Sequence, residues 1–450
     1  MIRELLEARA GEDLDLYARY VNPQFVRVLR TIGFDRTWAR TEGAYLYDDR
    51  GERYLDMLGG FGMFNVGRNN ARVEAALMEA LELDTPGSVQ MGLSALPGLL
   101  AEELVRRAPA SIAKVLFANS GTEANEAALK LGRAATRRTR VLSTERGFHG
   151  LTLGSLSAAG DDSYTDRFQP LLPGFERVPW GDAEALEQQL RREDVAVFLV
   201  EPVIGHGVHL PPPEYLPAAQ ALCRRYGTLF AVDEVQTGFG RTGRMFALEH
   251  WALEPDLVTV AKSLSGGYVP VGALLMSQHV YDVVFDSLEH SVSHGSTFAP
   301  NDLAMAAGLA TLREFDEEGL VERAARLGDL LLERTRPLAD AHATVRDVRG
   351  LGLIWAIEFA EPDGGSLSWR VLERVQPGLF AQLVAVPLFT RHRILSQVAG
   401  FKTAVLKAIP PLVVTEDDID WFVRALEDVI AKATRPTRVA GMAVRAARAR

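Results

Sequence analysis

The chain has 450 residues, of which 47% are hydrophobic and 24% charged, an ordinary composition for a soluble globular protein of one to three domains. Its formal net charge of −10 argues against nucleic acid as the main partner. No apolar run is long enough to span a bilayer, and the N-terminus lacks the apolar core of a secretory signal, so we predict no membrane partner and a cytoplasmic location.

The first 60 residues are predicted to form a helix and a hairpin. Within residues 11–33, apolar side chains recur at near-helical spacing, which predicts one amphipathic helix outside the core domain. The sequence Asp49-Arg50-Gly51 then indicates a turn between two strands. We assign residues 1–60 to this N-terminal segment.

Residues 61–302 are predicted to form the large domain. Apolar runs alternate with helical patterns here, which indicates βα units and a mostly parallel sheet covered by helices on both faces. The predicted strands are 114–118, 139–144, 195–203, 228–233 and 257–261. The only cysteine, Cys223, rules out an intrachain disulfide framework and suits a reducing compartment. It lies in a helical pattern, so we expect a buried structural thiol.

Residues 303–434 are predicted to form a smaller α+β domain. The pattern is helical from Leu303, then indicates strands around 345–359, and ends in an amphipathic helix over 416–433. The basic tail, residues 435–450, is predicted to be a frayed end.

Two charged side chains in the large domain follow buried strands. Asp233 ends the run 228–233, and Lys262 follows the run 257–261 before a glycine-rich loop. Ligands of open α/β sheets bind at such strand ends, and a buried lysine is costly unless its amine is used. Pyridoxal phosphate (PLP) chemistry needs both groups, an amine for a Schiff base and a carboxylate for the pyridine nitrogen. Each residue alone is better explained as a solvated lysine or a capping aspartate.

Seven motifs taken together favour a PLP site over these single-residue explanations. Their order and spacing resemble those of the class III aminotransferases of PLP fold type I, over roughly residues 39–430. The motifs are Asn119-Ser-Gly-Thr-Glu-Ala-Asn125, Phe148-His149-Gly150, Glu201-Pro202, Asp233-Glu-Val-Gln236 with Gly240-Arg-Thr-Gly243, Pro255-Asp256, Lys262 with Gly266-Gly267, and Gly295-Ser-Thr297. The resemblance implies a PLP-dependent enzyme with a mostly parallel sheet and a smaller C-terminal α+β domain.

The resemblance also implies which residues contact the cofactor. Lys262 would bind it as a Schiff base and then move a proton, Asp233 would pair with the ring nitrogen, and Glu201 would support them. The ring would lie between Phe148 and Val235. The other implied cofactor residues are Gly121 and Thr122 at the phosphate, Gln236 at the phenolic oxygen, and Thr297 from a second subunit. Ser120, His149 and Ser296 are also predicted to bind the cofactor. Such a site implies a homodimer with shared active sites.

The phosphate position is also supported by local chemistry. Ser120, Gly121 and Thr122 lie between a strand and a helical stretch, where unpaired N–H groups and the helix dipole favour an anion. Simple N-capping by Ser120 or Thr122 would explain the motif if it stood alone.

Three positions depart from members that use α-amino acids with 2-oxoglutarate. Leu151 stands where a basic residue is typical, His206 where a glutamate is typical, and Lys407 where an arginine is common. A lysine binds a carboxylate only as a point charge, although Lys407 can still attract an acceptor. We predict a substrate pocket that includes Phe64, Leu151, His206 and Lys407.

We therefore predict a homodimeric aminotransferase that moves an amino group from a diamine or ω-amine to a keto acid or aldehyde, near the putrescine branch of the family. The alternatives are an ornithine- or 4-aminobutyrate-type enzyme using 2-oxoglutarate, a PLP-dependent mutase or decarboxylase, and a non-catalytic binding protein. The pairs His206/His209 and His290/His294 supply too few ligands for a metal site, and we predict none.

Overall fold

The computed structural model describes residues 1–84, 87, 92–362, 365, 369–370, 378–399 and 404–433. The predicted tail, residues 435–450, lies outside this range. In these described parts, no helix combines the length and the apolar character needed to cross a bilayer.

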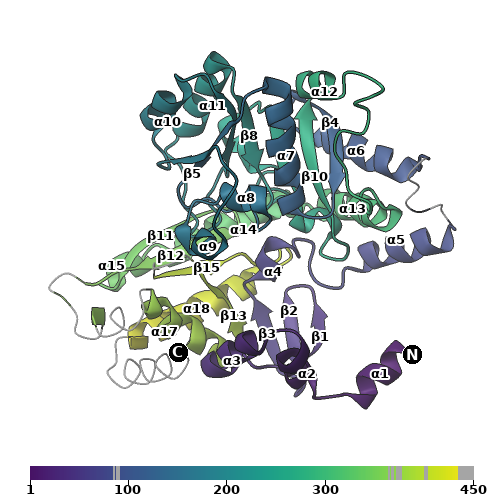
Figure 1. The fold of residues 1–450 in the computed structure, drawn as a ribbon. Helices are drawn as coiled ribbons and strands as arrows, with labels where there is room; N and C mark the ends of the chain where they lie inside the picture. Colours follow the sequence, from purple (N-terminus) through teal and green to yellow (C-terminus); the bar gives the residue numbers. More distant parts are fainter. Residues whose placement is uncertain are drawn as a thin grey trace.

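A seven-stranded sheet forms the centre of the large domain, in the order β4-β10-β9-β8-β7-β5-β6 (Figure 1). Only β10 runs antiparallel to its neighbours, so the prediction of a mostly parallel sheet is confirmed. All five predicted strands are present, whereas β6 and β10 were not predicted. The strands are β4 Ile112–Ala118, β5 Arg140–Thr144, β6 Phe175–Val178, β7 Val195–Val200, β8 Leu229–Asp233, β9 Leu257–Val260 and β10 Gly272–Ser277.

Helices cover both faces of this sheet because its strands are apolar on both sides. In β7, Val197 and Leu199 pack in the cluster that holds α7 (Gly121–Thr136) and α12 (Gln278–Val284). Phe198 and Val200 face the opposite cluster. Helices α6 (Ala95–Arg107), α10 (Ala183–Leu190) and α11 (Tyr215–Tyr226) contribute to that second cluster. Cys223 of α11 is fully buried there, and burial raises the pKa of its thiol, as expected for a structural cysteine.

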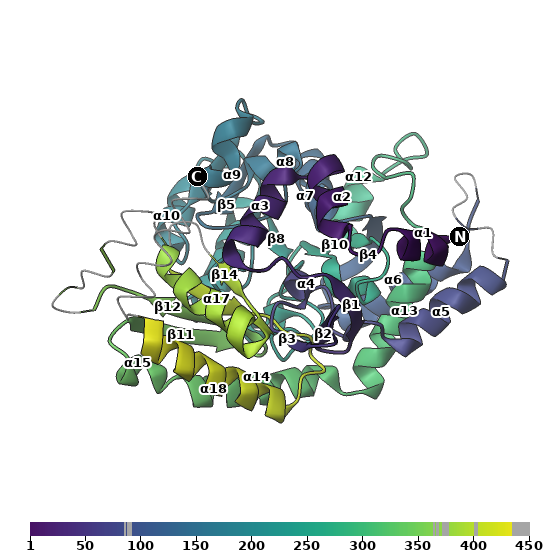
Figure 2. The same cartoon turned by 90° about the horizontal axis from the view of Figure 1, so that it is seen from below.

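The N-terminal helix prediction is corrected by the structure. Residues 13–32 form two helices, α2 (Asp13–Tyr20) and α3 (Pro23–Ile32), after a first helix α1 (Ile2–Ala8). The break occurs at Asn22, which is extended and caps α3 by accepting a hydrogen bond from the Phe25 N–H at 3.0 Å. Pro23 has no N–H and fits only the first turn of a helix. Figure 2 shows the three helices along the outside of the molecule.

Two four-stranded sheets lie below the large sheet in Figure 1. The first contains the predicted hairpin, β2 (Tyr45–Asp48) and β3 (Arg53–Asp56), with β1 (Trp38–Glu42) on one side and β13 (Ile394–Leu395) on the other. Since β13 pairs parallel with β3, the C-terminal part of the chain completes the N-terminal sheet.

The second small sheet has the order β11-β12-β15-β14. It confirms the strands predicted around 345–359, and the final helix has the predicted bounds. The sequence did not predict α17 or the short strands after it. The elements of this part are β11 Val345–Leu351, β12 Ile354–Phe359, β14 Gln397–Ala399, β15 Val405–Ala408, α14 Leu320–Thr335, α17 Leu379–His392 and α18 Glu416–Ala433.

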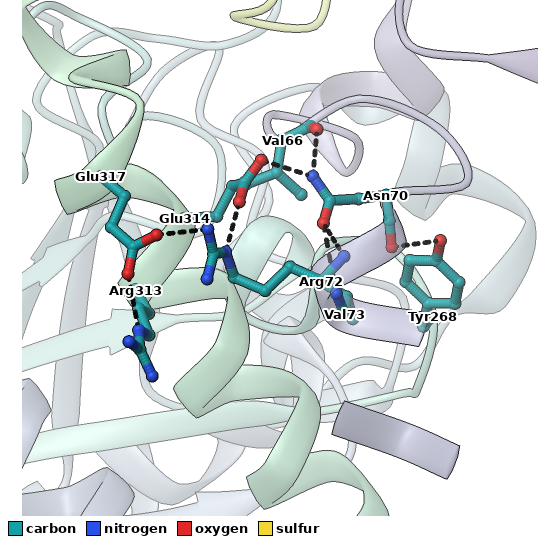
Figure 3. Close-up of polar contacts among 8 residues, drawn as sticks. All are labelled: Val66, Asn70, Arg72, Val73, Tyr268, Arg313, Glu314 and Glu317. Atoms are coloured by element: carbon teal, nitrogen blue, oxygen red, sulfur yellow. Dashed lines mark hydrogen bonds and ion pairs between the residues drawn. The ribbon is translucent and has the colours of Figure 1, made fainter. Parts of the chain in front are cut away.

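Helices α5 (Ala71–Glu82) and α13 (Asp302–Glu317) are joined by a charged network (Figure 3). Arg72 donates to Glu314 at 2.7 Å and also pairs with Glu317. Asn70 caps α5 and donates to Glu314 at 2.8 Å. The Tyr268 hydroxyl donates to the Asn70 carbonyl at 3.3 Å. The network therefore ties the loop that follows Lys262 to the start of α5.

The buried guanidinium of Arg241 joins three segments that are distant in the sequence. It donates to the Leu353 carbonyl at 2.9 Å, the Pro410 carbonyl at 2.6 Å and the side-chain oxygen of Asn65. Within the described ranges no carboxylate bonds it, and burial lowers its pKa to about 9. Through two backbone carbonyls, the loop after β8 is thereby attached to the turn between β11 and β12 and to the segment after β15, and through the Asn65 side chain it is attached to the segment before α5.

We expect Arg241→Leu to lower the stability of the protein markedly, because each buried acceptor left without a donor costs about 1–3 kcal/mol. Thermal and urea unfolding would measure the loss. Arg244→Leu is the matched control, since Arg244 lies in the same loop and is exposed, so its replacement should change stability by less than about 0.5 kcal/mol. Equal stability of the two variants would contradict the role given to Arg241.

Candidate active site

A cavity of about 770 Å³ opens where β8 and β9 end and α7 begins. Most of the predicted site residues line it. They are Ser120, Gly121, Thr122, Phe148, His149, Leu151, Glu201, His206, Asp233, Val235, Gln236, Lys262 and Lys407. The carboxyl ends of parallel strands and a helix N-terminus therefore meet at one place, as ligand sites of α/β proteins do.

Three predicted residues lie outside the lining of this cavity. Phe64 packs behind it, and its ring lies where a side chain at Gly267 would have to be. Ser296 accepts a hydrogen bond from the side chain of Asn119 at 2.7 Å. Thr297 is exposed. The roles of these three residues stay predictions.

Asp233 is the most strongly held group of the site. It is 3% exposed, and its carboxylate accepts from His149 Nδ1 at 2.8 Å, Asn125 Nδ2 at 2.8 Å and the Val235 N–H at 3.0 Å. Burial alone would raise the pKa of Asp233, but the hydrogen bonds, chiefly that from His149, outweigh it and lower the pKa. The carboxylate is therefore kept ionised in the interior.

His149 is the partner that keeps Asp233 ionised. Burial alone would lower the pKa of His149, but the hydrogen bond and charge of Asp233 raise it. The other ring nitrogen, Nε2, is buried and bonds no other group in the described part of the chain. Asn125 is itself fixed by the Thr259 hydroxyl at 2.8 Å, so both donors to Asp233 have a defined position.

Lys262 begins a short 3₁₀ helix, Lys262–Ser265, immediately after β9 and Ala261. Its φ of 43° is in the left-handed region, which is unusual for a residue with a side chain. Burial lowers the pKa of its amine, although the charges of Asp233 and Glu201 act in the opposite direction. A larger fraction of uncharged, nucleophilic amine follows at neutral pH.

The start of α7 provides an anion site. Ser120 caps the helix by accepting from the Glu123 N–H at 3.3 Å, so the capping interpretation holds for Ser120. Gly121 and Thr122 form the first turn of α7, where backbone N–H groups have no acceptor within the helix. Both residues line the cavity, and the helix dipole is positive at this end. A side chain at Gly121 would come within 2.7 Å of Val235, so glycine brings these N–H groups close to that residue.

Glu201 supports the backbone on one side of the cavity. Its carboxylate accepts from the Phe148 N–H at 3.0 Å and from the Gly205 N–H at 3.0 Å. Burial raises the pKa of Glu201. The Phe148 ring then lies 5.1 Å from the ring of Tyr164, whose hydroxyl is 3.1 Å from His206 Nδ1. Tyr164 was not predicted, because no motif marks its short polar helix.

Lys407 of β15 is 3% exposed and lines the cavity. Its ammonium donates to the Gly205 carbonyl and to the side-chain oxygen of Gln236, both at 2.6 Å. Burial lowers its pKa to about 7. Two of its three N–H bonds are thus used inside the protein.

The pair His290/His294, considered for a metal, is otherwise engaged. His290 bonds Asp286 at 2.6 Å, and His294 bonds Lys130 at 3.0 Å. Across the described ranges, no three His, Cys, Asp or Glu side chains are grouped as metal ligands would be.

Comparison with known proteins agrees with this geometry. The family model Aminotransferase class-III matches residues 32–430. Putrescine aminotransferase of Pectobacterium atrosepticum is 37% identical over 436 residues, which cover 94% of this chain and 89% of that protein. Aminotransferase PigE of a Serratia species is 35% identical over 455 residues, covering 93% of this chain and 53% of PigE. This chain therefore spans about half the length of PigE.

A solved structure extends the likeness to three dimensions. Ornithine aminotransferase from Toxoplasma gondii superposes with a TM-score of 0.83 at 29% identity, and the match covers 97% of this chain and 98% of that chain. That structure holds PLP at its active site with partial occupancy.

The charged pair Asp233–His149 predicts a pH-dependent stability. A raised histidine pKa stabilises the fold below about pH 6.5, and this contribution fades as pH rises through the folded value. A lowered aspartate pKa stabilises it above about pH 3.9, and this contribution fades as pH falls through the folded value. The pair is therefore most stabilising between about pH 4 and 6.5.

We expect His149→Leu to reduce stability by about 1.5–3 kcal/mol in that window, and by less at alkaline pH. Urea unfolding of the cofactor-free protein across pH would measure the difference. His279→Leu is the control, because His279 is exposed and its loss should cost little at any pH. A His149→Leu deficit that is constant from about pH 5 to 9 would contradict a charged pair.

Proposed function

Since the chain belongs to the class III aminotransferases and is a PLP-dependent transaminase, we propose that its donor is a diamine or ω-amine and its acceptor a keto acid or an aldehyde. The relatives named above support transfer of an amino group. The proposal of a diamine or ω-amine donor rests on the residues that line the cavity.

The residues of the cavity fit PLP on their own chemistry. An ionised buried carboxylate, Asp233, suits a protonated ring nitrogen, and the start of α7 suits a phosphate. His149 keeps that carboxylate charged through the hydrogen bond from its Nδ1. Phe148 and Val235 line the same cavity and supply apolar surface for an aromatic ring.

When bound, PLP supplies an electron sink for charge that develops at the substrate carbon. Asp233 keeps the ring nitrogen protonated, which that role requires. Lys262 supplies the amine that holds the cofactor and, once released, accepts and returns the proton at the substrate carbon. Its lowered pKa favours the uncharged base for this step. Glu201 holds the backbone of Phe148 in position.

One observation carries the donor proposal: among the described cavity-lining residues, none is an arginine. A carboxylate bound to the cavity would thus lack the bidentate fork that an arginine provides. Leu151 is 63% exposed and apolar. Burial lowers the pKa of His206, so it is uncharged at neutral pH. A substrate with an uncharged or amine-ended aliphatic chain therefore fits beside Leu151 and His206 better than one with an α-carboxylate.

We also propose that the enzyme is a homodimer with shared active sites. Thr297 is exposed and does not line the cavity of its own chain, as expected of a residue that reaches a second subunit. Apolar side chains around it are exposed in the single chain, at 95% for Leu288, 86% for Val292 and 73% for Phe298. Such surface is typical of an interface. The free buried thiol of Cys223 supports the further proposal of a cytoplasmic location.

The donor proposal predicts that simple diamines and longer aliphatic amines exceed ornithine and glutamate in kcat/KM by about tenfold or more, the value of one charge-assisted hydrogen bond. Steady-state kinetics with pyruvate and with 2-oxoglutarate would measure this. Lys262→Ala should fold normally and show no turnover with any donor. Ornithine or glutamate ranking above every amine would refute the proposal.

The shared-site proposal predicts complementation between inactive subunits. Mixing Lys262→Ala with Thr297→Ala should place both changes in one site of a heterodimer and leave the other intact, restoring about a quarter of the wild-type activity after random exchange. Mixing Lys262→Ala with Asp233→Asn is the control and should restore none, because both residues serve the same chain's site. An active, PLP-saturated monomer in sedimentation would contradict the shared site.

A further inference from the structure

Lys407, Gly205 and Gln236 form a buried hydrogen-bonded cluster at the wall of the cavity. The Lys407 ammonium donates to the Gly205 carbonyl and to Gln236 Oε1, both at 2.6 Å. The other end of the Gln236 amide, Nε2, donates to the Phe61 carbonyl at 3.1 Å. Gln236 and Lys407 both line the cavity.

The chemistry of these neighbours permits only one orientation of the Gln236 amide. The Lys407 ammonium can only donate, and the neutral amine still has two hydrogens for its two protein acceptors, so the amide atom that faces Lys407 is the oxygen. The Phe61 carbonyl can only accept, so the atom that faces it has to be the nitrogen. Two neighbours on opposite sides of the amide thus specify the same orientation, and an inverted amide would meet a donor with a donor and an acceptor with an acceptor.

The backbone at Gly205 is shaped to admit this oxygen. A side chain at Gly205 would lie 2.3 Å from Gln236 Oε1, which is closer than any real contact, so only glycine leaves room for the amide. Gly205 is itself held by its N–H bond to Glu201 at 3.0 Å. The position of the amide oxygen is therefore determined by packing as well as by the bond to Lys407.

We propose that Lys407 is a positioning residue, which fixes the Gln236 amide so that its second N–H is presented to the cavity as a donor. This inference rests on the proposed function, in which Gln236 bonds the phenolic oxygen of PLP. That oxygen is an acceptor when ionised, and a fixed donor stabilises it without a cost of reorientation.

This role differs from that of a carboxylate receptor. A receptor would affect only substrates with a carboxylate, whereas an amide-positioning lysine acts through the cofactor and affects both half-reactions. Its position supports the second role, because two of its N–H bonds are committed to protein acceptors and its side chain is 3% exposed.

The test is a double-mutant cycle on the full-length protein with Lys407→Met, Gln236→Leu and the double variant. The cofactor dissociation constant is measured by titrating cofactor-free protein with PLP, and the visible absorption band of bound PLP is recorded. We expect either single change to weaken PLP binding about twofold to tenfold and to shift the band, and the double variant to be no worse than Gln236→Leu. Lys407→Met should also raise the KM of the keto acid and of the amine by similar factors.

The outcomes separate this inference from the function on which it rests. If Gln236→Leu changes the PLP affinity and the band but Lys407→Met does not, or if the two effects add fully, the positioning role is overturned while the function stands. If Gln236→Leu changes neither, the proposed Gln236–cofactor contact is overturned, and this inference with it. If Lys407→Met does not fold, Gly205→Ala decides, because it should displace the same oxygen and shift the band, and an unchanged band would overturn the proposal.

Discussion

The structure depends on keeping one almost fully buried carboxylate, that of Asp233, ionised. Asp233 is held at the end of a central strand by two side-chain donors and a backbone N–H, and each side-chain donor belongs to a separate segment. Burying a charge without such partners would cost several kcal/mol, and the group would take up a proton instead. The hydrogen bonds to Asp233 thus join the central sheet to α7 and to the loop at His149.

The same constraint recurs in two buried cations that pair with no carboxylate in the part of the chain that the structure describes. Arg241 and Lys407 are bonded to oxygens of backbone and amide groups. Because these acceptors are neutral, burial lowers the pKa of both groups. Arg241 joins distant segments of the chain, and Lys407 lies at the cavity itself. Both cations therefore connect segments that follow strands of the large sheet with segments of the second small sheet.

The sequence predicted the elements whose signals are local. Long apolar runs predicted five central strands, and periodicity predicted α18 with its bounds, because burial on one or two faces dictates those patterns. It did not predict β13, which has two residues and exists only because β3 offers a free edge. The motifs placed Asp233, Lys262 and the start of α7 at one cavity. They could not show that Lys407 bonds Gln236, because such a contact joins residues 171 positions apart through tertiary packing.

The backbone at Lys262 has a consequence for evolution. Its left-handed φ of 43° is disfavoured for any residue but glycine, so the wild-type lysine holds some conformational energy at the reacting position. A glycine at position 262 would relieve the strain of this backbone conformation but would remove the amine that the proposed chemistry uses. Stability and the proposed chemistry therefore favour different residues at this position.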